Sequence, residues 1–137
     1  MTRSGYTDDY DDGKIWLYRR AVDNAIGGKR GQAFLRDLKV ALDALPEQTL
    51  AAGGLVGPEG VCAMGAVALH RGIDRETLAR VDADDPEIVA DLLNIAPSMA
   101  KEIAFLNDDD TGYFGGDDAA RYHRLRAWAA DETRGVK

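Results

Sequence analysis

The chain has 137 residues, of which 45% are apolar and 30% are charged, and its net charge is −7. This length allows one domain with its own core and this composition excludes intrinsic disorder, while the longest apolar run, residues 61–69, is too short for a membrane span. One cysteine, Cys62, excludes an internal disulfide and nothing resembles a secretory signal, so we expect a cytoplasmic protein.

Apolar residues recur at helical spacing along most of the chain, after a polar stretch at 1–10 that we expect to be flexible. The pattern predicts helices over residues 14–26, 32–45, 61–71, 86–95, 97–106 and 118–132, and a short helical turn over 75–80. The predicted boundaries are residues that cap or break helices, namely Asp11 or Asp12, Gly27, Gly28, Pro46, Gly72, Asp74, Asp85, Pro86, Pro97 and Asp117.

Residues 47–60 are the least regular part, because four glycines and a proline prevent a stable helix there. They can hold one short extended segment near 49–56. The predicted fold class is therefore mainly α, a compact single-domain bundle of about five to six short helices over residues 11–132, with a flexible tail at 133–137. The predicted core consists of Ile15, Leu38, Leu42, Val67, Ile88, Leu92, Ile103, Leu125 and Trp128.

The stretch IGGKRGQ, residues 26–32, lies between two predicted helices and has two interpretations. Glycines let backbone N–H groups approach a phosphate, and the following helix would direct its positive end at the anion. A P-loop, however, needs a preceding strand and a Gly-Lys-Ser/Thr ending, and both are missing. The alternative is a tight corner between two helices. The candidate anion-binding residues are Gly28, Lys29, Arg30, Gly31 and Gln32.

Cys62 lies near the start of a predicted helix, where the helix dipole would make a thiol more reactive. His70 follows eight positions later, roughly 12 Å along the same helix, which is too far for a direct pair. The alternative is that Cys62 and the small residues after it allow helices to pack closely. Cys62 stays a ligand-binding candidate, together with Asn107.

Asn107 opens an acidic, glycine-rich stretch, NDDDTGYFGGDD, over residues 107–118. Its spacing partly matches an EF-hand loop, but the first residue is not Asp and the twelfth is not Glu, so we expect no metal. The side chains can instead cap helix ends, or the stretch can be a recognition loop in which aromatic surface lies beside acids. The candidate partner-binding residues are Asp108, Asp109, Asp110, Tyr113, Phe114, Asp117 and Asp118.

The charge is unevenly distributed along the chain. Residues 13–39 sum to +5, whereas residues 81–118 hold eleven acidic side chains against Lys101 and sum to −10. An acidic surface repels phosphate, so we do not expect direct nucleic-acid binding. The acidic segment is either a solvated surface that keeps the protein in solution or a docking surface for a basic partner.

GKRGQAFLR at residues 28–36, the segment CAMGA from Cys62 to Ala66, and Asn107–Asp108 before a basic aromatic helix form a recognisable combination. Over residues 5–130 it resembles small uncharacterised proteins of phages and prophages. The CAMGA and Asn107–Asp108 pair is also similar to a bacterial domain family of unknown function, in which a tryptophan often precedes the cysteine; here Val61 stands there. The first resemblance implies a phage accessory protein. Action against host defence is one role that this resemblance suggests.

Two functional hypotheses follow. The first is a non-enzymatic interaction protein that binds a host protein or complex through its acidic segment. The second is a small-ligand or nucleotide-binding protein, or a weak enzyme, that uses the Gly28–Gly31 corner with Cys62 and Asn107. Neither hypothesis calls for a cofactor, because the sequence holds no metal-ligand set and no catalytic motif.

Overall fold

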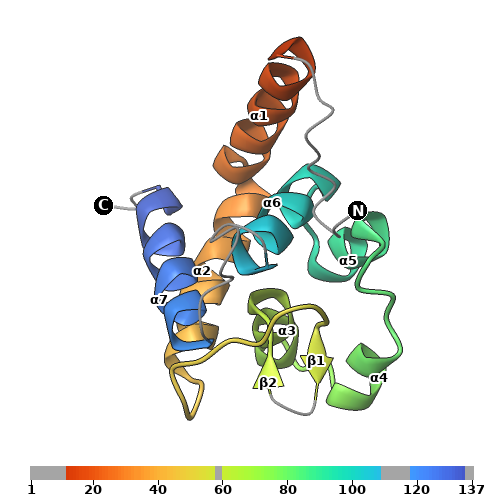
Figure 1. The fold of residues 1–137 in the computed structure, drawn as a ribbon, viewed down its shortest axis with the longest axis vertical. Coiled ribbons are helices and arrows are strands. Elements are labelled where there is room, and N and C mark those ends of the chain that lie inside the picture. Colours follow the sequence, from red (N-terminus) through yellow and green to blue (C-terminus); the bar gives the residue numbers. More distant parts are fainter. Residues whose placement is uncertain (1–11, 58–59, 109–117, 135–137) are drawn as a thin grey trace.

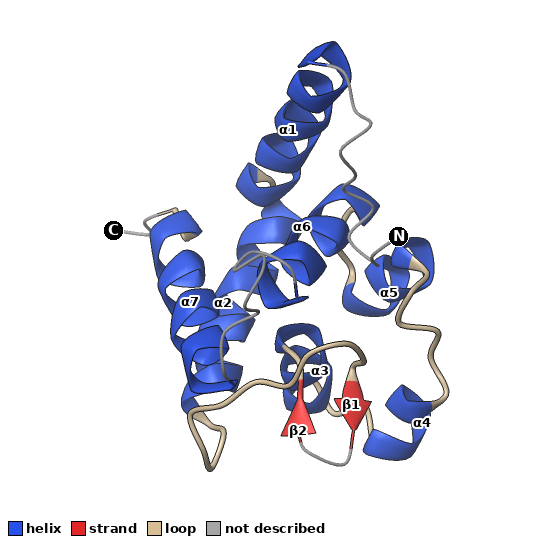
Figure 2. Ribbon diagram, in the orientation of Figure 1, coloured by secondary structure: helices blue, strands red, loops and turns tan. Residues whose placement is uncertain are grey.

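The computed structural model describes residues 12–57, 60–108 and 118–134, and the fold within these ranges is mainly α, as the sequence predicts. The predicted flexible stretch at 1–10 lies outside the described residues. Figure 1 and Figure 2 show helices on several sides of α3 (Ala63–His70) and a small sheet beside it, while α1 (Asp12–Gly27) projects away from it. The elements are α1 (Asp12–Gly27), α2 (Lys29–Asp43), β1 (Val56–Gly57), β2 (Gly60–Val61), α3 (Ala63–His70), α4 (Arg75–Ala79), α5 (Pro86–Leu93), α6 (Pro97–Asp108) and α7 (Asp118–Glu132).

Helix α3 is the centre of the hydrophobic core. Its residues 63–68 are all buried, and it packs against α2, α5 and α6. A helix enclosed in this way has no polar face. Close approach depends on Gly65, where an added Cβ would lie 1.9 Å from the carbonyl oxygen of Leu55. The small residues of this stretch therefore let the backbone of the preceding loop contact the helix directly.

Helices α1 and α2 are separated by a single residue, Gly28, rather than by the predicted linker 27–31. Gly28 is extended, with φ −76° and ψ 172°, and α2 begins at Lys29. The second helix is predicted to begin at Gln32, but it begins three residues earlier, so that Gly31 lies in the first turn of α2. In Figure 1 the first part of α1 projects beyond the other helices.

The extended segment predicted near 49–56 is displaced toward the C-terminus. Strands β1 and β2 form an antiparallel pair in which Val56 lies opposite Val61. The predicted helix over 61–71 consequently begins two residues later, at Ala63, because Val61 belongs to the sheet and Cys62 is the N-cap of α3. β-branched valines facing each other across the pair account for the shift.

Five of the nine predicted core residues are fully buried, namely Leu38, Leu42, Val67, Ile103 and Leu125. Leu92 and Trp128 are half-buried against the core, and Ile15 stays a prediction because its side chain lies outside what the structure describes. Ile88 is a wrong prediction, since it is 47% exposed. The stretch IVADLL is apolar on more than one side, and α5 buries Val89, Ala90 and Leu93 instead.

The C-terminal parts of two predicted elements also differ from expectation. Helix α6 continues through Asn107 and Asp108, beyond its predicted end at residue 106. Thr133 and Arg134, assigned to a flexible tail, continue from α7 and make backbone hydrogen bonds to Ala129 and to the side chain of Gln32. Both ends are extended because side chains from other helices bind their backbone groups.

Candidate functional site

The Gly28–Gly31 corner combines a close helix contact with an uncapped helix end. A Cβ at Gly31 would lie 2.1 Å from the carbonyl oxygen of Ala25, so glycine is required where α2 crosses the last turn of α1. Gly28 is the N-cap of α2 and provides no side chain to accept from the first-turn N–H groups. The corner is therefore tight at Gly31 and open at Gly28.

Gln32 fixes this corner to the far end of the chain. Its Nε2 donates to the carbonyl oxygens of Ile26, at 2.8 Å, and Glu132, at 3.0 Å, and its Oε1 accepts from the backbone N–H of Arg134 at 2.6 Å. The side chain is nearly fully buried. Both hydrogens of its amide nitrogen and its oxygen are used in these bonds, so Gln32 positions the corner and has no amide hydrogen left for a ligand.

An open cleft of about 480 Å³ lies at this corner, and a smaller one of about 210 Å³ adjoins it at Gly28 and Lys29. The larger cleft is lined by Gly27, Gly28, Lys29, Gln32, Arg36 and Arg134. Arg30 lines the smaller one and donates to Asn94 Oδ1 over 3.5 Å. We call the larger space the basic cleft, since its three charged lining residues are all cations.

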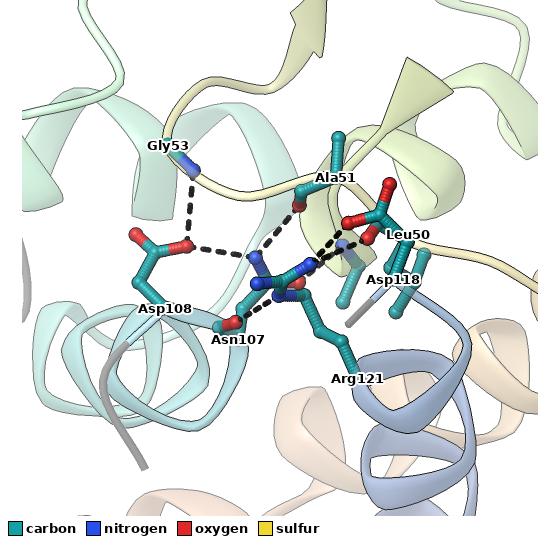
Figure 3. A network of polar contacts seen from close by, with 8 residues as sticks. Leu50, Ala51, Gly53, Asn107, Asp108, Asp118 and Arg121 are labelled. Atoms are coloured by element: carbon teal, nitrogen blue, oxygen red, sulfur yellow. Dashed lines mark hydrogen bonds and ion pairs between the residues drawn. The ribbon is translucent and has the colours of Figure 1, made fainter. Parts of the chain in front are cut away.

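Cys62 and Asn107 meet at the start of α3, as Figure 3 shows for Asn107. The sulfur of Cys62 accepts from the N–H of Gly65 at 3.4 Å, and Oδ1 of Asn107 accepts from the N–H of Ala63 at 3.1 Å. Both side chains have no exposed surface. They satisfy N–H groups that a helix leaves without an internal partner, so this pair caps α3 rather than facing solvent.

Arg121 completes a buried polar network around Asn107 that the sequence analysis missed (Figure 3). Its Nε donates to the carbonyl oxygen of Asn107 at 2.6 Å, and its Nη1 donates to Leu50 O at 2.9 Å and to Asp118 Oδ1 at 2.7 Å. Asn107 Nδ2 donates in turn to Ala51 O at 3.0 Å. The network joins the end of α6, the start of α7 and the loop at 50–51.

Asp108 and Asp118 take part in this network instead of lying in a solvated loop. Asp108 Oδ1 accepts from the N–H of Gly53 at 3.1 Å and from Asn107 Nδ2 at 2.8 Å. Asp118 pairs with Arg121, and its carbonyl oxygen accepts from the N–H of Leu50. The other partner-binding candidates, Asp109, Asp110, Tyr113, Phe114 and Asp117, lie outside the described residues.

The structure does not bring the second hypothesis's residues into one site. Gly28 and Gly31 share a cleft with Ala96, which immediately precedes α6, whereas Asn107 lies in the last turn of that helix. Eleven residues of mostly helical chain separate these two ends by about 16 Å. Cys62 and Asn107 are adjacent, but they lie far from the Gly28–Gly31 corner and are buried.

The exposed side of α5 combines an apolar side chain with acids, a combination that is not among the predicted site residues. Glu87, Ile88 and Asp91 lie on this side at spacings of three and four residues. Neither Glu87 nor Asp91 forms an ion pair with any residue that the structure describes. We call these three residues the α5 face. The exposed acids Asp82 and Asp84 precede it.

A third cleft, of about 340 Å³, is mainly apolar and lies beside the sheet, where Leu45, Val61 and Leu69 contribute to its walls. Two charged residues, Glu47 and Arg75, also line it, and Arg75 donates to the carbonyl oxygen of Gly57 at 3.1 Å. The described residues hold no cluster of three or more His, Cys, Asp or Glu side chains suited to a metal ion. None of the described helices combines the length and apolarity needed to cross a membrane.

No protein-family model, curated protein or solved structure matches this chain. The resemblance to phage and prophage proteins therefore stays a prediction.

Proposed function

We propose that this protein is a non-enzymatic interaction protein that binds a basic surface of a host protein or complex through the α5 face. The observation that carries the proposal is Ile88, a large aliphatic side chain that is 47% exposed between two acids without a described cationic partner. An apolar anchor surrounded by charge is typical of a protein interface, where the anchor supplies affinity and the charges steer encounter.

The charge distribution supports a basic partner. Asp82, Asp84, Glu87 and Asp91 are all exposed within ten residues of one another, and no lysine or arginine occurs between them. Four negative charges at this density attract a complementary surface over about 8 Å at physiological ionic strength. Asp108 and Asp118 contribute less to this attraction than expected, because each carboxylate binds a group of the same molecule, the N–H of Gly53 and the guanidinium of Arg121 respectively.

The resemblance to phage and prophage proteins supports a partner in the bacterial cytoplasm. The finer form of the proposal is that binding inhibits a host defence complex, many of which expose basic surfaces because they handle nucleic acid. On this hypothesis the acidic protein occupies a surface that phosphates would otherwise contact.

The test compares which proteins the purified protein and its variants retain from a bacterial lysate. One variant reverses charge on the α5 face (Glu87→Lys with Asp91→Lys), and a second removes the anchor (Ile88→Ser). The matched control makes the same change in net charge elsewhere, through Glu47→Lys with Asp131→Lys, both exposed and without a described ion pair. Circular dichroism checks that every variant is folded.

We expect one discrete partner that the original protein and the control retain and that both α5 variants lose. Binding of that purified partner should weaken as salt rises, mainly through a slower association rate. Retention of the same partner by the α5 variants, or the absence of a discrete partner, would contradict the proposal.

A further inference from the structure

We propose that the basic cleft binds the phosphate chain of a small molecule that carries two or three linked phosphates. This inference goes beyond the proposed function and does not depend on it. The three cations Lys29, Arg36 and Arg134 line one cleft of about 480 Å³, and no acidic side chain among the described residues lines it. Their combined charge matches that of a diphosphate or triphosphate group.

Among the described residues the three cleft cations lack acidic partners, as Arg30 and Arg75 also do, whereas several other arginines are paired. Arg71, Arg80, Arg121 and Arg126 each pair with a carboxylate at 2.7–3.0 Å. Lys29, Arg36 and Arg134 form no ion pair with any acid in the described ranges. The chain has 24 acidic residues and 17 lysines and arginines, so a group of unpaired cations at one cleft is unexpected if it serves only the fold.

Gly28 is the second, independent feature. Its φ of −76° and ψ of 172° suit any residue, and an added Cβ would meet nothing closer than 3.6 Å. Serine or aspartate would therefore fit at this N-cap and would stabilise α2 by accepting from its first-turn N–H groups. Glycine leaves those N–H groups without a side-chain acceptor and open to an anion in the cleft.

The backbone of the third cation is fixed by the fold, and its guanidinium lies beside the corner. Gln32 binds the backbone N–H of Arg134 at 2.6 Å, and the guanidinium of Arg134 lies against Gly27, where an added Cβ would be 2.7 Å from Nη1. Gly27 thus leaves the space that the guanidinium occupies beside the α1–α2 corner. A cation that is positioned before binding loses less conformational entropy when a phosphate arrives.

The experiment is isothermal titration calorimetry, in which the full chain is titrated separately with sodium pyrophosphate, ATP and adenosine at low salt. Two variants address the cleft, Gly28→Asp and the pair Arg36→Gln with Arg134→Gln. The matched control, Lys39→Gln with Arg80→Gln, removes the same charge outside the cleft. Thermal unfolding of each variant is recorded, because Gly28→Asp provides a helix cap and should unfold at the same or a higher temperature.

We expect pyrophosphate and ATP to bind and adenosine not to bind, since the phosphate chain is the recognised group. Each cleft variant should lose at least about tenfold in affinity. The arginine pair loses its charged hydrogen bonds to phosphate, and the carboxylate of Gly28→Asp repels it. The control should stay within about twofold of the original protein. ATP binding without pyrophosphate binding would contradict a site for the phosphate chain alone. Equal affinity of Gly28→Asp, an equal loss in the control, or binding of a single-stranded oligonucleotide but not of pyrophosphate would overturn the proposal.

Discussion

The side-chain amide of Asn107 at the end of α6 accepts a hydrogen bond from the backbone N–H of Ala63, the first residue of α3, at 3.1 Å. One side chain therefore caps a helix that begins 44 residues earlier. The same amide donates to Ala51 O and to the side chain of Asp108, so that two distant backbone segments and one neighbouring carboxylate depend on this residue.

Asn107→Ala should destabilise the protein by about 2–4 kcal/mol, because it leaves the buried N–H of Ala63 and carbonyl of Ala51 without a side-chain partner. Urea unfolding measures the change. Asn107→Asp is the informative companion, since it keeps an acceptor for Ala63 but places a second carboxylate beside Asp108. Its loss of stability should shrink at low pH, and a pH-independent loss would show that charge is not the cause.

Gly31→Ala should cost about 1–3 kcal/mol, because its Cβ would overlap the carbonyl oxygen of Ala25 and force α1 and α2 apart. Gly28→Ala, three residues earlier, is the control; its Cβ meets only ordinary contacts. Thermal unfolding of the two variants should separate them clearly. Similar melting temperatures would mean that α1 and α2 can move apart at this corner with little loss of stability.

Leu38→Ala should cost about 2–5 kcal/mol, as expected for a fully buried leucine. Val40→Ala lies on the same helix but is 52% exposed, and it should change stability by no more than about 0.5 kcal/mol. Chemical denaturation of both variants tests which face of α2 is buried.

The Cys62 thiol should react with an aromatic disulfide reagent only as fast as the protein opens, since the side chain has no exposed surface. The reaction is followed by absorbance in native buffer and in denaturant. Complete labelling within the mixing time in native buffer would show that α3 opens locally at its N-terminus.

Asp74 should make a small contribution to acid sensitivity. Hydrogen bonds from the backbone and then the side chain of Thr77 hold the pKa of its carboxyl below the usual range. A carboxyl whose pKa is lowered by folding stabilises the protein above its ordinary pKa, and this stabilisation is lost as the pH falls through the lowered value. Asp74→Asn should flatten the acid limb of the stability profile slightly, and an NMR titration of the carboxyl reads the pKa directly.

Local signals in the sequence predicted much of the fold. Asp74 and Asp85 cap α4 and α5 as predicted, with Pro86 at the first helical position, and α5 ends at Leu93, two residues before the predicted end, with Asn94 in a left-handed conformation. These features depend on neighbouring residues alone, so one sequence is sufficient to identify them.

The candidate site was harder to predict because its parts come from distant segments. Arg121 looks like a surface residue of α7, and only the carbonyl oxygens of Leu50 and Asn107 explain its burial. Arg134 was assigned to the tail, although it lines the basic cleft beside Lys29 and Arg36. Ile88 was assigned to the core because apolar residues occur on several sides of α5. Periodicity does not show which partner covers each face.

The attachment of α7 has a consequence for how the chain folds. Its contacts join Arg121 to Leu50 across 71 residues, Tyr122 to Leu42 across 80, and Arg134, just beyond the helix, to Gln32 across 102. Loops of this length must close before the contacts form, and such closure slows folding relative to helices that pair with their neighbours in sequence. During synthesis the surface of α2 that α7 covers is therefore left exposed until residues 118–134 emerge, which makes the nascent chain most prone to aggregation at that stage.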